Sequence, residues 1–405
     1  MAASLSCSAG FVLGMDLGTT SVKDKQDPAL IIAALDQCMD ALPKDKMKKV
    51  KCIGVCGQMH GCEWLSEDEI IRFIPKDVSQ LITWQDGRCS ADFLSSLPKP
   101  DSHLSVATGF GCATIFWYMK HRPEFLSGFS DAGTIQDYVV SMLCSLDKCV
   151  MTGQNAASWG YFNTTSNKWN TQILKDAGFP VQLLPVVVES GAVAGHTSSE
   201  WYGIPAHTAV GAALGDFQCS VYSCMTDKGD AVLNMSTSAQ LTFGMPAEFM
   251  AASLNGGNVM ATFVRMLDSW MKEFGLEVNE STIYSQLIQS ALAQPNTDLT
   301  VTTVLLGERH DPTSSASVSQ ISPSNLSLGH VTWAVCRGIV ENMATMMPPR
   351  SLQAAGVRCI IGSGSALSCN TVLQQEVERV FPFPVVYGKD VDSAVGVAMV
   401  FNDQT

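Results

Sequence analysis

A run of acidic, glycine and hydroxyl residues near the start of the chain has the composition of a phosphate-binding loop. It follows the apolar stretch 11–13 and comprises Asp16, Gly18, Thr19, Thr20, Ser21 and Lys23. Gly18 permits a tight turn and a close backbone approach to a ligand, and the hydroxyl and N–H groups after it can line phosphate oxygens. Asp16 is a hard oxygen ligand of the kind that holds Mg²⁺. The alternative is a solvated turn rich in Thr and Ser.

A second carboxylate, Asp216, lies among small residues at the end of another apolar run, in Gly215-Asp216-Phe217-Gln218. Phosphoryl transfer requires the protein to position the reactants, to neutralise charge and to accept a proton from the attacking hydroxyl. An aspartate within hydrogen-bonding reach of that hydroxyl can act as the base. The alternative role for Asp216 is to cap the helix that follows.

Two polar clusters follow short apolar runs in the first half of the chain. They contain Gln58, Met59 and His60, between two glycines, and then Trp84, Asp86 and Arg88. Ligands of open α/β sheets gather at the carboxyl ends of strands. An indole offers a flat face to a sugar ring, while carboxylate and guanidinium groups can bond its hydroxyls. The clusters therefore predict a sugar site. The alternative for His60, taken alone, is a packed or solvated histidine.

Apolar periodicity supplies the elements that position these residues. Strands are expected at 11–13, 51–56, 231–234 and 357–361, and helices at 28–42, 259–274 and 330–347. Asp27 and Pro28 form a good helix start. After the last of these strands come Gly362, Gly364, Ser365 and Asn370. A strand, a glycine turn and a helix N-terminus together favour an anion or nucleotide site.

The composition limits the function classes. With 405 residues, two domains are expected, and the polar break at 227–230 marks the boundary. A net charge of −13 argues against nucleic-acid binding. No apolar run is long enough to cross a bilayer. The chain has 14 cysteines but no paired zinc-type spacing and no recognisable secretion signal, so we expect reduced thiols and a cytoplasmic protein.

The order of these motifs resembles that of the FGGY carbohydrate kinases. Gly57-Gln58-Met59-His60-Gly61 followed by Trp84-Gln85-Asp86-Gly87-Arg88 is similar to the sugar-binding half of the branch that acts on ketoses such as xylulose and sedoheptulose. Chaperone ATPases and actin lack such a pair. The resemblance implies an α/β fold with two ribonuclease-H-like domains of the actin/hexokinase type around a cleft. These would be a sugar-binding domain at 10–226 and a nucleotide-binding domain at 227–402.

The resemblance also implies roles for individual residues. It makes Asp216 the catalytic base, Asp16 a Mg²⁺ ligand, Asn155 a sugar contact and Thr237 part of a second phosphate loop. ATP would phosphorylate the terminal hydroxyl of a ketose, with sedoheptulose preferred and xylulose or another polyol as the alternative. The expected partners are the sugar and ATP, without nucleic acid or membrane, and the oligomeric state stays open. For Asn155 an ordinary loop amide is an equal alternative.

The chain departs from the family pattern directly after Lys23. Family members place two antiparallel strands between the first phosphate loop and the first helix, whereas here Lys23 is followed within five residues by Pro28. Each missing strand would need about 5–6 residues. We therefore expect a shortened form, in which the first strand is an exposed sheet edge and both stability and kinase activity are poor. A non-catalytic ATP-dependent switch protein is the remaining alternative.

Overall fold

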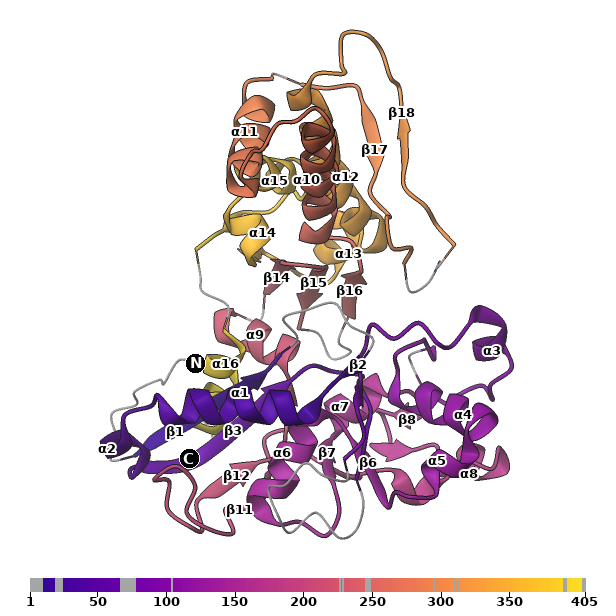
Figure 1. The fold of residues 1–405 in the computed structure, drawn as a ribbon, viewed down its shortest axis with the longest axis vertical. Helices are drawn as coiled ribbons and strands as arrows, with labels where there is room; N and C mark the ends of the chain where they lie inside the picture. Colours follow the sequence, from indigo (N-terminus) through magenta and orange to yellow (C-terminus); the bar gives the residue numbers. More distant parts are fainter. Residues whose placement is uncertain are drawn as a thin grey trace. The chain divides into compact units, whose positions relative to one another are not determined.

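The computed structural model divides the chain into two compact units. The first unit is Met1–Ser223 together with Asp392–Thr405, and the second is Cys224–Val391. The structure describes residues 10–18, 25–65, 78–102, 105–225, 227, 229–244, 249–294, 296–308, 311, 313–388 and 392–402. Each unit contains its own mixed β-sheet with helices packed against it (Figure 1).

The sheet of the first unit is centred on one long buried strand, β3 (Val50–Gly57). Its strand order is β1-β3-β12-β11, and β13 also pairs with β3. β1, β12 and β13 are all parallel to β3, whereas β11 is antiparallel to β12. The other members of this sheet are β1 (Phe11–Leu17), β11 (Val193–His196), β12 (Ala209–Gly211) and β13 (Leu214–Gly215).

Alternating residues of β1 and β3 serve two different cores. Leu13, Met15 and Leu17 face a core shared with α1 (Pro28–Asp40) and α6 (Ile135–Cys144). Val12 and Cys56 belong to a separate core with the last helix, α16 (Ser393–Asn402). The sheet is therefore covered on both faces, as expected for a parallel α/β sheet.

Helix α1 begins where the sequence predicts. Asp27 is its N-cap, with Oδ1 accepting from the Ala29 N–H at 2.9 Å, and Pro28 is its first residue. The remaining elements of the first unit are β2 (Lys25–Gln26), α2 (Lys44–Met47), β4 (Glu63–Leu65), β5 (Leu81–Ile82), α3 (Ala91–Ser95), α4 (Gly111–His121), α5 (Pro123–Leu126), β6 (Asp131–Gly133), β7 (Val150–Thr152), α7 (Gly153–Ser158), β8 (Phe162–Asn163), β9 (Lys168–Trp169), α8 (Thr171–Asp176), the 3₁₀ helix η2 (Val181–Leu183), β10 (Val186–Val188) and α9 (Asp216–Cys224).

The C-terminal helix α16 belongs to the first unit. The sequence placed it at the end of the second domain, but it packs on β1 and β3. Glycines make this close approach possible: a Cβ on Gly14 would lie 1.9 Å from the Ala394 carbonyl oxygen, and one on Gly396 would lie 1.8 Å from that of Cys219. Contacts between segments so far apart in the sequence cannot be predicted from the spacing of apolar residues within either segment.

Only a trace of strand structure lies between β1 and α1 in the residues described there. β2 has two residues and pairs antiparallel with β5, not with β1. Within the described part of the chain, β1 is the terminal strand of its sheet and pairs only with β3. The expected edge position of the first strand is therefore observed, although residues 19–24 lie outside the described part.

The second unit has a five-stranded sheet in the order β16-β15-β14-β19-β20. β14 is antiparallel to β15 and parallel to β19, so the ends of β14 and β19 lie at the same edge of the sheet. The strands are β14 (Asp230–Met235), β15 (Ala239–Phe243), β16 (Phe249–Ser253), β17 (Thr300–Thr302), β18 (Ser317–Ser319), β19 (Cys359–Ser363) and β20 (Val385–Val386). The helices are α10 (Gly257–Glu273), α11 (Glu280–Leu292), α12 (Leu328–Met346), α13 (Pro349–Ala354), α14 (Ser365–Ser368) and α15 (Thr371–Val380).

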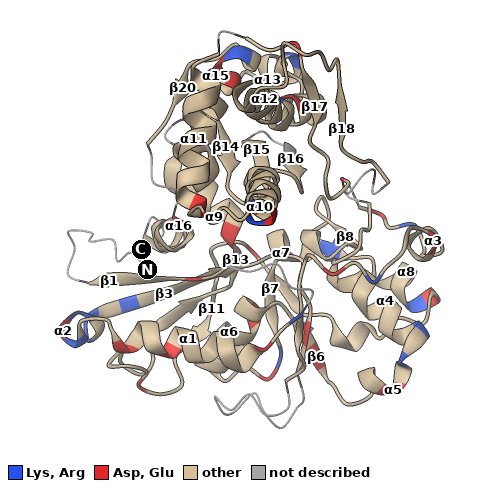
Figure 2. Cartoon of the chain, turned by 45° about the horizontal axis from the view of Figure 1, so that its top comes forward, with Lys and Arg blue, Asp and Glu red and all other residues tan. Residues whose placement is uncertain are grey.

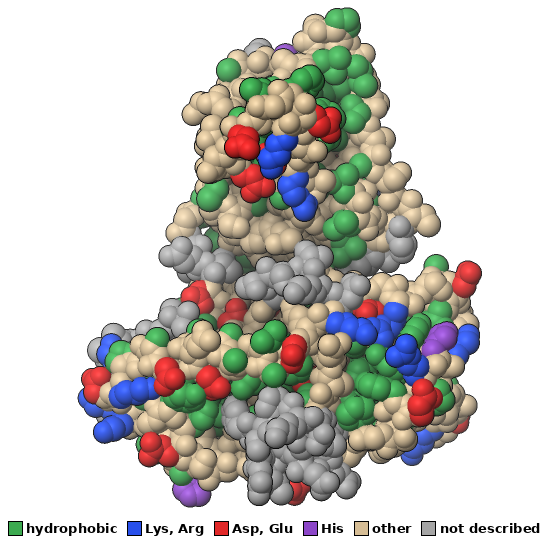
Figure 3. Space-filling view, viewed as in Figure 1, with side chains coloured by type: hydrophobic (Ala, Val, Ile, Leu, Met, Phe, Trp, Pro, Cys, Tyr) green, Lys and Arg blue, Asp and Glu red, His purple; other side chains and the backbone are tan. Residues whose placement is uncertain are grey.

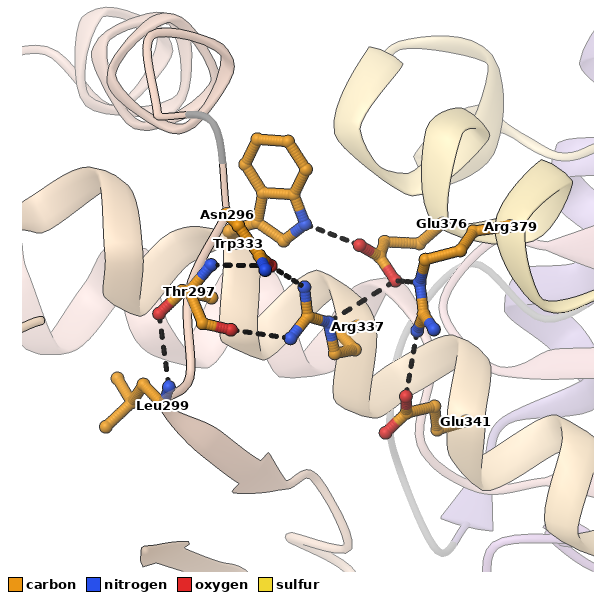
Figure 4. A network of polar contacts seen from close by, with 8 residues as sticks. All are labelled: Asn296, Thr297, Leu299, Trp333, Arg337, Glu341, Glu376 and Arg379. Atoms are coloured by element: carbon orange, nitrogen blue, oxygen red, sulfur yellow. Dashed lines mark hydrogen bonds and ion pairs between the residues drawn. The ribbon is translucent and has the colours of Figure 1, made fainter. Parts of the chain in front are cut away.

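Helices α12 and α15 are joined by a polar network around the buried carboxylate of Glu376 (Figure 4). Glu376 accepts from the Trp333 indole and, at 2.7 Å, from Arg379 Nε. Arg337 lies 3.6 Å from the same carboxylate and donates to the Thr297 carbonyl at 2.7 Å. The buried charge is thus matched by cations, which is the condition for its retention in a core.

Charged residues are dispersed over both units (Figure 2). Acidic residues outnumber basic ones, 38 to 25, and the Lys and Arg positions of the described ribbon are scattered along many elements instead of forming one stripe. In the part of the chain that the structure describes, no helix is long and apolar enough to cross a membrane.

The contact of α16 with α9 yields a stability prediction. Gly396→Ala places a methyl group against the Cys219 carbonyl, so overpacking should lower the free energy of unfolding by about 1–3 kcal/mol. This loss is expected although alanine is the better helix former. Urea unfolding measures it, with Gly128→Ala as the control because the nearest atom there is 3.9 Å away. An unchanged or raised stability of Gly396→Ala would contradict the packing.

Candidate active site

Asp16 and Asp216 lie on either side of the end of β3. Asp16 pairs with Cys56 in the parallel register of β1, and β13, which pairs with Cys56 and Gly57 from the other side, runs directly into Asp216. Adjacent strands are about 4.8 Å apart. Two carboxylates that are 200 positions apart in the sequence are therefore held at one end of one sheet.

Burial and neighbouring carboxylates raise the pKa of both carboxyl groups. Desolvation by the surrounding protein, followed by the charge of Asp16, raises the pKa of Asp216 to about 7. Desolvation and then the Asp392 carboxylate raise the pKa of Asp16 to about 6. A base with a pKa near the working pH combines the ionised form with a strong tendency to accept a proton. The environment of Asp216 fits that role.

Sequence reasoning missed the C-terminal contribution to this site. Asp392 caps α16 by accepting from the Val395 N–H at 3.0 Å. The Cys56 thiol donates to Asp16 Oδ1 at 3.8 Å and to the Ser393 carbonyl at 3.4 Å. The small residues between Ser393 and Ala398 indicate a helix that packs closely on its neighbours. They do not indicate which elements those neighbours are.

Met59 and His60 extend from β3 toward this site. Met59 lies against Gly215, where a Cβ would be 2.5 Å from its sulfur. His60 has a positive φ of 69°, its Nδ1 lies 2.6 Å from the Ser158 carbonyl, and its ring stacks on Phe110 with centroids 4.6 Å apart. These contacts fix the imidazole against the segments that carry Phe110 and Ser158.

Gln58 is buried behind the same strand end. Gln58 is only 2% exposed, and its side-chain Nε2 donates to Gln26 Oε1 at 2.9 Å. Gln136 donates to the carbonyls of Gly57 and Gln58 at 3.2 and 3.1 Å. Gln58 therefore supports the loop that carries Met59 and His60.

Asp86 and Arg88 form a closed ion pair. Arg88 Nε and Nη2 donate to the two oxygens of Asp86 at 2.6 and 2.7 Å, and the guanidinium lies over the rings of Trp117 and Tyr118. The Asp86 hydrogen bond raises the pKa of Arg88 against its desolvation. Asp86 and Arg88 thus bond each other, and their expected contact with sugar hydroxyls stays a prediction. Trp84 is half-buried.

Arg88 also lines a separate cavity of about 330 Å³. Its other lining residues are Ser90, Asp92, Phe93, Ser96, Trp117, Lys120 and His121. Figure 3 shows basic and histidine side chains gathered on the α3–α4 side of the first unit. Because Asp16 and Asp216 are not among the lining residues, this cavity is distinct from the site at the end of β3.

Asn155 lies deeper than the sequence predicts for a sugar contact. It is fully buried, and its Nδ2 donates to the Ala213 carbonyl at 3.3 Å. The Thr152 hydroxyl donates to the same carbonyl at 2.9 Å. Both side chains thus hold the segment that leads into Asp216, and the sugar contact of Asn155 stays a prediction.

The nucleotide-site candidates of the second unit gather at the ends of β14 and β19. Thr237 is exposed in the loop after β14, and Ser365 is exposed at the start of α14. Gly364 has a φ of 92°, and a Cβ there would lie 2.3 Å from the Met235 carbonyl. A Cβ on Gly362 would meet the Tyr387 ring at 2.7 Å. The glycines therefore allow the loops to approach each other closely.

Asn370 and the residues of the first predicted phosphate loop complete the nucleotide-site candidates. Asn370 is buried and caps α15 by accepting from the N–H groups of Val372 and Leu373 at 3.0 and 3.2 Å. Gly18 is described and exposed, whereas Thr19, Thr20, Ser21 and Lys23 lie outside the described residues. In the described residues, no three His, Cys, Asp or Glu side chains form a metal cluster.

Comparisons with known proteins decide the family. Residues 22–223 match the N-terminal domain of the FGGY family of carbohydrate kinases. The sedoheptulokinase of Mus musculus is 56% identical over 409 residues, covering 93% of this chain and 86% of the relative; that of Homo sapiens is 55% identical over the same length, with the same coverage. The chain belongs to the FGGY family of carbohydrate kinases. Members of this family transfer a phosphoryl group from ATP to a sugar.

Solved structures confirm the fold prediction. The xylulose kinase of Rhodospirillum rubrum matches with a TM-score of 0.77 at 18% identity, covering 97% of this chain and 89% of that one. The glycerol kinase of Plasmodium falciparum with ADP matches with a TM-score of 0.73 at 15% identity, covering 96% and 88%. The FGGY chain therefore has the two-domain α/β fold of the actin/hexokinase type.

The role of Asp216 yields the first prediction on activity. Asp216→Asn keeps the shape but cannot accept the proton, so turnover should fall about 10²–10⁴-fold. Because the base must be ionised, the parent rate should rise with pH and level off above about 7. Steady-state kinetics between pH 5.5 and 8.5 measure both effects. Parent-like turnover of the variant, or a rate that falls through this range, would exclude Asp216 as the base.

His60 yields a prediction on sugar binding. His60→Ala removes a ring that Ser158 and Phe110 hold shortly after the end of β3. If His60 contacts the sugar as the sequence predicts, the sugar KM should rise while the ATP KM changes little. The kinetics of one preparation with each substrate varied in turn measure the ratio. Val186→Ala, at an exposed position of the first unit, is the control for nonspecific effects. An effect confined to the ATP KM would place His60 outside the sugar site.

Proposed function

We propose that this FGGY kinase transfers the γ-phosphoryl group of ATP to the terminal primary hydroxyl of sedoheptulose, giving sedoheptulose 7-phosphate. The observation that carries the proposal is the identity of 55–56% to two sedoheptulokinases over 93% of the chain. The xylulose kinases of bacteria are only 23–24% identical over 56% of the chain. This difference favours sedoheptulose over xylulose.

We propose a distinct task for each group of residues. Asp216 accepts the proton of the attacking hydroxyl, and its raised pKa suits that step. Met59, which lies against Gly215, and His60, which is held by Ser158, orient the sugar. The loop carrying Thr237 and the glycine turn at Gly364 receive the nucleotide in the second unit.

Asp16 fits a magnesium ion. Its carboxylate is exposed although desolvated, and Mg²⁺ in such sites takes one or two carboxylates and keeps several waters. The fit therefore does not require a larger acidic cluster. Bound there with ATP, Mg²⁺ would neutralise charge on the phosphates. Asp16 itself is held in place by the Cys56 thiol.

The compartment that we propose is the cytoplasm. None of the 13 cysteines in the described part of the chain forms a disulfide, and most are buried among apolar side chains. Thiols used in this way suit a reducing environment.

A second candidate function is that of a catalytically impaired variant. β1 has only β3 as a strand neighbour in the described sheet, and β2 has two residues. The aligned stretch of 409 residues is also longer than this chain, of which 93% takes part, so the relatives carry additional residues opposite gaps. A poorly fixed phosphate loop would lower turnover, because misplacement by about 1 Å can cost roughly 10²-fold.

One experiment separates these proposals. Sedoheptulose, xylulose, fructose and glycerol are each offered with ATP and Mg²⁺, and ADP release and the phosphorylated product are measured. We expect the highest kcat/KM for sedoheptulose, with turnover of about 1–100 s⁻¹, and loss of turnover with EDTA. A higher kcat/KM for xylulose would overturn the substrate. Turnover far below this range would support the impaired variant, and ATP turnover independent of sugar would support a switch protein.

A further inference from the structure

Glu308 is a buried carboxylate bound by four neutral donors. Its Oε1 accepts from Ser253 Oγ at 2.6 Å, Asn255 Nδ2 at 3.0 Å and Asn342 Nδ2 at 2.8 Å. Its Oε2 accepts from the Leu254 N–H at 3.2 Å. Glu308 is only 3% exposed. A buried charge is costly unless hydrogen bonds satisfy it, so this arrangement fixes the segment 253–255 firmly.

The fixed segment leads directly into the N-terminus of α10. There the Gly257 N–H donates to the Ser236 carbonyl at 2.8 Å, and the Asn258 N–H donates to the Thr237 carbonyl at 3.0 Å. The Gly256 N–H is used by Asn258 Oδ1 at 2.8 Å. The first N–H groups of this helix are therefore bound to the loop after β14 and are not offered to a phosphate.

The contact between α10 and this loop is tight. A Cβ on Gly257 would lie 2.3 Å from the Ser236 carbonyl oxygen and 2.8 Å from the Ala366 Cβ. The loop therefore has no room to shift toward α10, and the first N–H groups of α10 bind the carbonyls of Ser236 and Thr237. Thr237 itself is exposed. The shape of the loop thus depends on the position of α10, which in turn depends on Glu308.

We propose that Glu308 is a positioning residue for nucleotide binding, which acts through Asn255 and the start of α10 on the loop that carries Thr237. The inference rests on the proposed function, because that function places ATP at this loop. It assigns a role to a residue that touches no substrate. Its separation from the loop explains why the motif pattern of the sequence does not reveal it.

Glu308→Gln tests the mechanism with little change in shape. The amide oxygen can replace Oε1 and keep three bonds, but the amide NH₂ then faces the Leu254 N–H, donor against donor. Glu308→Ala removes all four acceptor contacts. We therefore expect a graded rise in the ATP KM, small for Gln and about ten-fold or more for Ala, since a bond to a charged group is worth about one decade. The sugar KM should stay unchanged.

The matched control is Glu376→Gln. Glu376 is the buried carboxylate of the same unit that joins α12 to α15 (Figure 4), and its hydrogen-bond partners Trp333 and Arg379 lie on these helices and not in the loop after β14. Its variant should lower the Tm without raising the ATP KM. If all variants lower the Tm alike and none raises the ATP KM relative to the sugar KM, Glu308 is structural only and the proposal fails.

Direct binding separates this proposal from the proposed function. The dissociation constant of a fluorescent ATP analogue is measured on the full chain without sugar. Weaker binding by the Glu308 variants supports the proposal even if the parent phosphorylates no ketose, and unchanged binding overturns it even if the parent does. If Glu308→Ala does not fold, Ser253→Ala removes a single donor to Oε1 and is read by the same criterion.

Discussion

The parallel pairing of β1 and β13 with opposite sides of β3 is the constraint on which the site depends. It brings the end of the first strand and the start of α9 to Cys56 and Gly57, and so places Asp16 and Asp216 together. A shift of one residue in either register would turn the side chains of that strand to the opposite face. Hydrophobic residues on both faces of β1 oppose such a shift, because Val12 and Leu13 belong to two different cores.

The same constraint explains the glycines around the site. α16 lies so close to β1 and α9 that Gly14 and Gly396 leave no room for a methyl group. This closeness carries Asp392 and Ser393 to the neighbourhood of Asp16, where the charge of Asp392 raises its pKa. The electrostatics of the first motif thus depend on a segment almost 380 positions later in the sequence. Packing and acid–base chemistry cannot be changed separately here.

The sequence predicts local features better than the environment of each side chain. The strands β1 and β3, the cap at Asp27 and the helix α12 follow from apolar periodicity and capping residues. The closed pair of Asp86 with Arg88 and the burial of Asn155 do not, because residue types in a motif do not indicate whether a polar group faces a ligand or a neighbour. The hydrogen bonds around Glu308 were not predicted for a related reason. The residues of this cluster come from separate segments of the chain, and no single segment has a distinctive pattern.

The short connection before α1 has a consequence for the balance between folding and catalysis. β1 is a terminal strand in the described sheet, so its position depends on β3 along one edge and on helices on its two faces. β2 does not support it, because Lys25 and Gln26 pair with β5. Gln26 instead contacts Gln58, behind the loop of Met59 and His60. The described residues of the connection, Lys25 and Gln26, therefore contact the predicted sugar-binding side of the site and not β1. It follows that a weakened site should lose order first near Asp16, where side-chain packing has to hold a strand that ladder hydrogen bonds secure from one side only.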